Sequence, residues 1–176
     1  YYEARGGLAR FEKLKSLVEI GEMQAGPEMV LEVKTQTVFG EGMHTEISMA
    51  GAVMMGQTVT PTFGVNNQQG TQLPMSEEEL ATYQTSLTAT EYAHLEEMGY
   101  EAQLLGIHPN RGNPVYIVEI RKDGSTTKEL QFDAESGLLM QVNRAQKSPM
   151  GPLQITETFE NYRDFEGLLF PTLQTQ

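Results

Sequence analysis

Alternation of apolar and polar side chains is the feature of this sequence that most restricts its fold. Between residues 29 and 38 every second position is Met, Leu, Val or Thr, with mostly polar residues between them, and residues 43–49 repeat the pattern. A period of two places every second side chain on the same face of a β-strand. Residues 40–42, two of which are glycine, favour a tight turn between the two runs. The pattern therefore predicts an antiparallel hairpin.

Helical spacing occurs in two other places. Leu8, Phe11 and Leu14 lie three residues apart and predict an amphipathic helix over residues 2–15. Ser76 followed by Glu79 is a capping-box pattern, which predicts a helix from about residue 77 to 86, with a second short helical piece over 90–98. Glycine at position 99 suits the end of that piece.

Short strands account for most of the remaining chain. We expect one domain over residues 1–176, with the helix at 2–15, strands over 17–65, the helical insertion at 76–98, and strands over 100–172. This order predicts a mainly β fold with helices, of the α+β class. The expected architecture is a curved antiparallel sheet that forms an unclosed β-barrel, with helices covering its concave face.

The charge balance argues against several classes of function. The chain carries 24 acidic and 12 basic residues, a formal net charge of −12. Binding to the phosphates of nucleic acid needs clustered cations, so we expect no nucleic-acid partner. No apolar run approaches the roughly 20 residues of a membrane-spanning helix, so we expect no transmembrane segment. The absence of cysteine excludes disulfides and thiolate metal sites.

The motifs of the common catalytic sites are missing. Residues 94–98 read H-L-E-E-M, which resembles the H-x-x-E-H signature of inverted zinc peptidases, but Met98 stands where the second histidine ligand belongs. The sequence contains no G-x-S-x-G nucleophile elbow and no phosphate-binding glycine loop. We therefore expect no catalytic residues, no metal site and no cofactor. A metal hydrolase built on His94 and Glu97 is the enzyme alternative.

Methionine is the residue type that indicates a binding function. The chain has ten methionines, and six of them fall within residues 23–55. Methionine is unbranched and polarizable, so a strand face that carries it adapts to apolar ligands of different shape, such as acyl chains. Alternation selects the following candidates for an apolar cavity: Met29, Leu31, Val33, Met43, Ile47 and Met49. The alternative is that these side chains only pack beneath the helices.

Several segments together resemble a known family. They are residues 7–16 with 17–23, G-Y-E-A-Q-L-L-G at 99–106, F-D-A-E-S-G-L-L at 132–139, and N-Y-R-D-F-E-G-L-L-F-P at 161–171. The sequence resembles the LolA/LolB-like lipoprotein-carrier-like domains of bacterial envelopes, in particular those at the C-terminal end of some insulinase-like zinc peptidases. The resemblance implies an unclosed β-barrel with an apolar concave face, and in true carriers that cavity holds the acyl chains of lipoproteins.

The resemblance implies a function without catalysis in this chain. We expect a periplasmic or cell-envelope accessory domain of a zinc peptidase, whose metal and catalytic residues belong to upstream domains of the same polypeptide. A start at Tyr1 is expected for such a terminal piece. The expected ligand is a lipid or the acyl chain of a lipoprotein. A free-standing periplasmic carrier of lipids or lipoproteins is the alternative.

Overall fold

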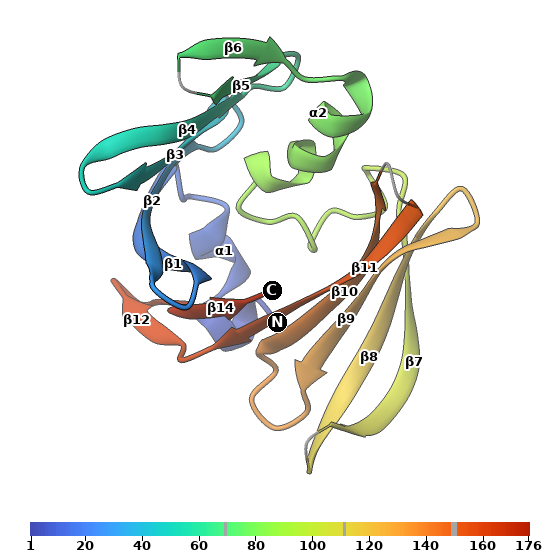
Figure 1. Ribbon diagram of the computed structural model, residues 1–176. Coiled ribbons are helices and arrows are strands. Elements are labelled where there is room, and N and C mark those ends of the chain that lie inside the picture. Colours follow the sequence, from blue (N-terminus) through green and yellow to red (C-terminus); the bar gives the residue numbers. More distant parts are fainter. Residues whose placement is uncertain (69, 111, 149–150) are drawn as a thin grey trace. The chain divides into compact units, whose positions relative to one another are not determined.

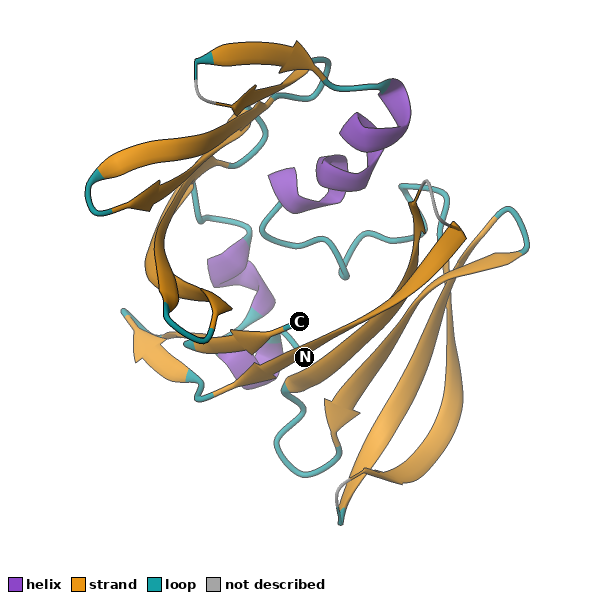
Figure 2. Cartoon of the chain, viewed as in Figure 1, coloured by secondary structure: helices purple, strands orange, loops and turns teal. Residues whose placement is uncertain are grey.

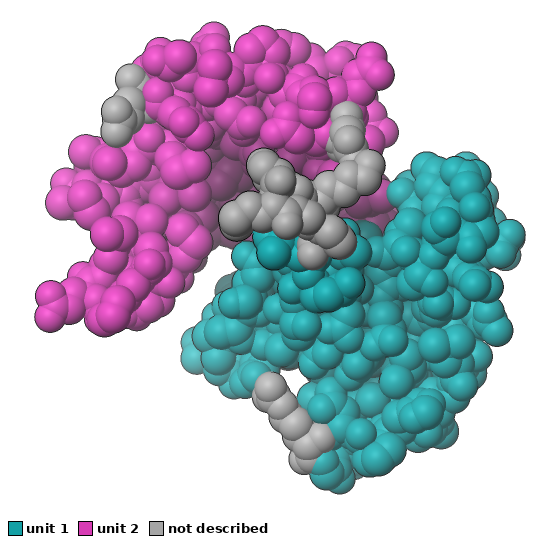
Figure 3. All heavy atoms as spheres, turned by 45° about the vertical axis from the view of Figure 1, so that its right-hand side comes forward, with its two compact units in different colours: residues 1–11, 92–176 teal, residues 12–91 magenta. Residues whose placement is uncertain are grey.

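Strands dominate the chain, and most of them belong to two separate six-stranded sheets. The computed structural model describes residues 1–68, 70–110, 112–148 and 151–176. The chain divides into two compact units: unit 1 is residues 1–11 with 92–176, and unit 2 is residues 12–91 (Figure 3). Each unit contains its own six-stranded antiparallel sheet, and neither sheet is closed into a barrel (Figures 1 and 2). That the two units act as one domain stays a prediction.

Unit 2 is a meander in which each strand pairs with the next along the chain. Its strands are β1 Ser16–Gly26, β2 Met29–Val38, β3 Gly42–Met49, β4 Ala52–Val59, β5 Gly64–Gln68 and β6 Thr71–Pro74. The predicted hairpin is confirmed, because β2 and β3 pair from Glu32↔Ser48 to Val38↔Gly42. Its turn contains Gly40, at φ 82°. The strands continue to residue 74, beyond the expected end at 65.

A short helix follows this sheet and packs on it. The helix α2, Glu77–Gln84, continues into the 3₁₀ turn η2, Thr85–Leu87. The predicted capping box is present: Ser76 Oγ accepts from the Glu79 N–H at 3.2 Å, and Glu79 Oε2 accepts from the Ser76 N–H at 2.8 Å. The Glu79 carboxylate accepts from the Ser76 N–H and, at 2.9 Å, from the Ser76 hydroxyl, and these two bonds hold the pKa of Glu79 below its ordinary value. Leu87 is buried, and its carbonyl accepts from the Gly40 N–H at 2.9 Å.

Unit 1 contains the longer meander and a small hairpin. Its main sheet has the order β14-β11-β10-β9-β8-β7, while β12 and β13 pair with each other. The strands are β7 Glu101–Asn110, β8 Asn113–Lys122, β9 Ser125–Asp133, β10 Leu139–Ser148, β11 Gly151–Glu160, β12 Arg163–Phe165, β13 Leu168–Phe170 and β14 Leu173–Thr175. Asp123 and Gly124 form the turn between β8 and β9, and both have positive φ. The sequence also favours a turn at residues 147–152, between β10 and β11, and residues 149–150 of this segment lie outside the described residues.

The core of unit 1 lies on one face of its sheet. The buried members are Ile120, Leu130, Leu139 and Val142, and Tyr92, Leu95 and Tyr100 pack against them. The segment that supplies these three side chains was expected to include a helix over 90–98, but it consists of turns. Gly99, at φ 77°, still ends it as predicted. Its N–H donates to Glu96 O at 3.0 Å and the Tyr100 N–H donates to Leu95 O at 2.8 Å, the two bonds of a Schellman motif.

The helix expected over residues 2–15 is interrupted. The structure has a 3₁₀ turn, η1 Glu3–Arg5, and a single helical turn, α1 Leu8–Phe11. The interruption falls at Gly6 and Gly7, whose φ angles of 115° and 103° are incompatible with an α-helix. Gly6 also approaches β13 so closely that an added Cβ would stand 2.1 Å from Gly167 O. The glycine pair therefore ends one turn and allows the backbone contact that packs η1 onto β13.

This close approach can be tested by adding one methyl group. We expect Gly6→Ala to lower the free energy of unfolding by about 3 kcal/mol or more, because it combines backbone strain with a collision against Gly167. Gly7→Ala is the matched control, since it has a similar φ but only Glu3 Oε2, at 3.9 Å, near the added carbon. It should cost about 1–2 kcal/mol. Urea unfolding measures both, and equal losses would contradict the role of the contact.

Arg5 attaches the N-terminal segment to the same hairpin. Its side chain is buried, and the guanidinium carbon lies 4.5 Å from the ring centroid of Phe11 and 4.9 Å from that of Phe170. Its Nε donates to Leu169 O at 2.7 Å. A planar guanidinium can stack on two rings and still donate in its own plane, whereas an ammonium group cannot. Arginine is therefore required here for its shape as well as its charge.

We expect Arg5→Lys to destabilise the fold by about 2 kcal/mol, because lysine keeps the charge but loses the stacking and the Nε hydrogen bond. Arg10→Lys is the control, since Arg10 makes an exposed hydrogen bond to Gly167 O on the same hairpin. It should change stability by less than about 0.5 kcal/mol. Thermal and urea unfolding give both values. A loss at Arg5 no larger than that at Arg10 would rule out the stacking.

Candidate ligand-binding face

The strand register in unit 2 places all six predicted ligand-binding residues on one face of the sheet. Val33 pairs with Ile47 and Thr37 pairs with Met43, so these side chains point to the same side. Met29, Leu31 and Met49 follow at intervals of two along the same strands. The predicted alternation is thus confirmed, and binding by these residues stays a prediction. We call this side of the β1–β6 sheet the methionine face.

One end of the methionine face is covered by the helix of unit 2. Met43 pairs with Val59 and Val59 pairs with Gly64, so the three form one row across the strands. Val59 is 0% exposed. An added Cβ on Gly64 would stand 2.4 Å from Met75 Sδ and 3.3 Å from Leu80 Cδ1. The segment that leads into α2 and the helix itself therefore close this end of the face.

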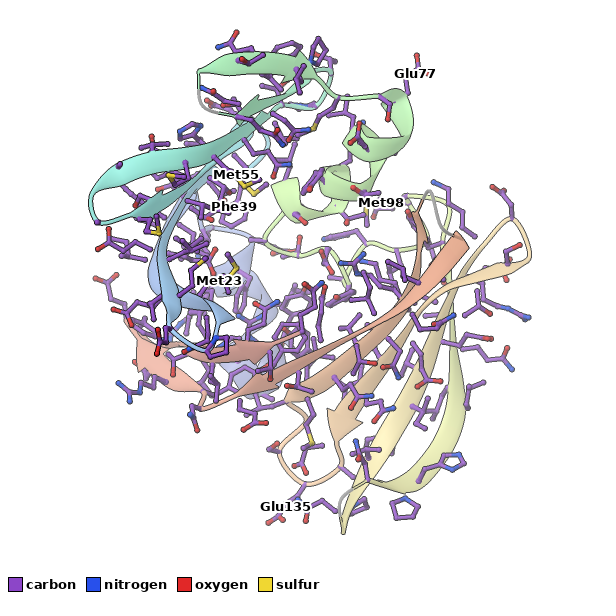
Figure 4. All side chains as sticks on the ribbon, viewed as in Figure 1. Met23, Phe39, Met55, Glu77, Met98 and Glu135 are labelled. Atoms are coloured by element: carbon purple, nitrogen blue, oxygen red, sulfur yellow. The ribbon has the colours of Figure 1, made fainter. Side chains whose placement is uncertain are left out.

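The other end of the face is open and rich in methionine. Met23 pairs with Leu31 and Met55 pairs with Ile47, which adds β1 and β4 to the same face. Met23 is 40% exposed and Met55 46% exposed. Figure 4 shows both side chains projecting from the side of the sheet on which α2 lies. Met29 and Met49 are also exposed, while Leu31, Val33, Met43 and Ile47 are half-buried. The open end therefore presents thioether side chains above a partly buried aliphatic layer.

A row of polar side chains separates the covered end from the open end. It runs through consecutive partners on five strands: Glu19, Thr35, Thr45, Gln57 and Asn66. The Thr35 and Thr45 hydroxyl groups lie 3.1 Å apart and share a hydrogen bond. Gln57 Nε2 donates to Asn66 Oδ1 at 3.1 Å. We call these five residues the polar row.

The opposite face of the sheet carries polar side chains together with exposed aliphatic ones, which are Val18, Ile20, Val30, Val38 and Val53. His44 Nδ1 lies 2.8 Å from Thr58 Oγ1, and its Nε2 lies 3.4 Å from Glu46 Oε1. Large apolar side chains on this face include Ile20 on β1, which is 77% exposed, and Val53 on β4, which is 56% exposed. Ile20 lies on the same strand as Met23, and Val53 lies on the same strand as Met55, but both point to the opposite face of the sheet.

The sequence indicates only part of this site. Met23 belongs to the alternation of β1, although the glycines at 21 and 26 weaken that pattern. Met55 follows Met54 directly, and alternation alone does not show which of the two shares a face with Ile47. The register shift of β4 settles this, because Ile47 pairs with Met55 and Ser48 pairs with Val53. Met54 is therefore the extra residue of a β-bulge.

The two residues considered for metal chemistry lie close together, but as an exposed pair. His94 Nδ1 lies 3.3 Å from Glu97 Oε1, which is one turn away, and both side chains are at least 40% exposed. Within the described residues, no three His, Cys, Asp or Glu side chains are arranged so that they could hold a metal ion. The helices that the structure describes are also too short, or not apolar enough, to cross a membrane.

Comparison with solved structures identifies the fold. The chain is similar to a LolA superfamily protein from Nitrosomonas europaea, with 12% identity, a TM-score of 0.55, and coverage of 89% of this chain and 73% of the other. The chain is also similar to a domain from Vibrio parahaemolyticus that is described as an outer membrane lipoprotein-sorting protein domain. The identity is 11%, the TM-score is 0.58, and the match covers 99% of this chain and 85% of the other. The fold is LolA-like.

A third structure extends this likeness. A DUF1329 family protein from Desulfovibrio piger matches with 13% identity and a TM-score of 0.58, and the match covers 97% of this chain and 82% of the other. No protein-family model matches the chain, and no curated protein sequence does. At these identities the likeness shows the fold alone. The expected unclosed β architecture is thereby confirmed.

Proposed function

We propose that the methionine face binds apolar ligands such as acyl chains, in a non-catalytic, lipoprotein-carrier-like domain of the bacterial cell envelope. The observation that carries the proposal is the set of exposed methionines on one face of the unit 2 sheet. Isolated apolar side chains on a surface are ordinary, but several on one face suit a binding surface. The LolA-like fold adds support, since one similar structure is described as a lipoprotein-sorting domain.

The energy available on such a face suits reversible binding. Burying hydrocarbon contributes about 0.8 kcal/mol per methylene, so a chain of about 14 carbons gains on the order of 10 kcal/mol before ordering costs. Micromolar affinity needs about 8 kcal/mol, which leaves only a small margin for those costs. The gain is spread over many contacts, so one methionine contributes a small part of it. A test of the face must therefore change at least two positions.

We expect Met23→Glu combined with Met55→Glu to weaken binding of the uncharged fluorescent probe N-phenyl-naphthylamine by about tenfold or more, because it places two charges on the apolar surface. Both residues are partly exposed, so the substitutions remove little core packing. Fluorescence titration gives the dissociation constants. Circular dichroism and urea unfolding verify that the variant is folded.

The matched control is Ile20→Glu combined with Val53→Glu. It adds the same charge on the same strands, β1 and β4, but on the opposite face. The control should bind the probe as the original protein does. Equal weakening in both variants, or no saturable probe binding to the original protein, would contradict the proposed site.

The biological setting is proposed separately from the site. The accessory role beside a zinc peptidase rests on sequence resemblance, and the carrier role rests on the same family likeness. The gene distinguishes them: a peptidase motif upstream in the same reading frame supports the accessory domain, and a signal peptide in that position supports a free-standing periplasmic carrier. Both settings use the methionine face in the same way.

A further inference from the structure

The polar row lies within a face that is mainly apolar on both sides of it. Thr37, Met43 and Val59 lie on the covered side of the row, and Val33, Ile47 and Met55 lie on the open side. Thr35, Thr45, Gln57 and Asn66 are half-buried, so each is partly accessible from solvent. A ligand on the open end would therefore meet hydrogen-bonding groups where the methionine-rich surface stops.

The row has hydrogen-bonding capacity beyond its internal bonds. A single hydrogen bond between Thr35 and Thr45 uses one hydroxyl hydrogen, so the other hydroxyl can still donate. Gln57 donates through Nε2 and Asn66 accepts through Oδ1, which leaves the Asn66 amide hydrogens able to donate to a ligand oxygen. These are neutral donors at the edge of the apolar surface.

The electrostatics of the sheet disfavour an anionic ligand group at this position. Lys34 is the only lysine or arginine between residues 16 and 74, and it pairs with Ile20 on the opposite face. Glu19 stands at the β1 end of the polar row. A carboxylate or phosphate placed at the row would thus lose solvation without gaining a cationic partner from strands β1–β6. An uncharged carbonyl or hydroxyl group pays a much smaller desolvation cost.

We propose that the polar row makes the methionine face selective for uncharged amphiphiles, whose hydroxyl or ester groups bind at the row while their hydrocarbon lies over the open end. This inference rests on the proposed function of the same face. The distance along β3 from Thr45 to Met49 is four residues, about 13 Å, which gives room for most of an extended chain of about 14 carbons. The row thereby determines which amphiphiles bind, and the methionines supply most of the affinity.

The selectivity is tested with two ligands of equal chain length. Monomyristoylglycerol and myristate compete with bound N-phenyl-naphthylamine, at a pH where the myristic acid is ionised. We expect the uncharged ester to displace the probe at about tenfold lower concentration than the anion. Equal potency, or tighter binding of myristate, would overturn the proposal.

Removing the hydroxyl groups tests the residues of the row directly. Thr35→Val combined with Thr45→Val should weaken monomyristoylglycerol about fivefold, the effect of about one net hydrogen bond, and leave probe affinity unchanged. Thr58→Val, on the opposite face of β4, is the control and should change neither. An unchanged ratio of ester to probe affinity in the double variant would overturn the role of the row.

A charge added to the row gives a second, independent readout. Gln57→Lys should improve myristate binding relative to monomyristoylglycerol, because it supplies the missing cation, and failure to shift this preference would contradict the electrostatic argument.

Binding of the fluorescent probe distinguishes failure of the proposed function from failure of the proposed selectivity. Loss of probe binding to the original protein would refute the methionine face itself, whereas probe binding without discrimination between ester and anion would refute only the selectivity.

Discussion

The methionine face depends on the pairing register of six consecutive antiparallel strands. Side chains on a strand alternate between faces, so a slip of one residue would move a whole strand's apolar set to the other side. Tight turns hold the register of β2 and β3, where Gly40 adopts a positive φ. The β-bulge at Met54 then corrects the register of β4, which places Met55 beside Ile47. A site spread over four strands is therefore specified by turns and a bulge as much as by its own residues.

Local signals in the sequence predict the parts of the fold that depend on neighbouring residues. The alternation of β2 and β3, the capping box at Ser76, and the glycine at 99 that ends its segment are all present in the structure. In the turn before β10, Asp133 Oδ1 accepts from Ser136 Oγ and from the Ser136 N–H, both at 2.7 Å, and these bonds hold the pKa of Asp133 below its ordinary value. Each feature rests on contacts within a few residues, so the sequence contains the information directly.

The features that the sequence does not predict depend on distant contacts. Periodicity favours a helix over 2–15, but the approach of Gly6 to Gly167 requires a backbone that no helix allows. The polar row is also invisible along the chain, since its members come from five strands and become neighbours only through pairing. The same alternation that places Val33 on the apolar face places Thr35 there as well. The pattern along a single strand therefore predicts which residues share a face, but it does not predict the polar row that crosses that face.

In the site we propose, affinity and selectivity come from different positions along the same strands. A face of methionine and aliphatic side chains alone would bind hydrocarbon with little regard to the attached group, because dispersion and desolvation are not directional. Hydrogen bonds are directional, and an unmatched polar group costs more than a matched one contributes. The shared bond between Thr35 and Thr45 reduces the cost of the half-buried row when no ligand is present. Because each strand contributes to both regions, the distance between them is set by strand geometry and does not depend on loop conformation.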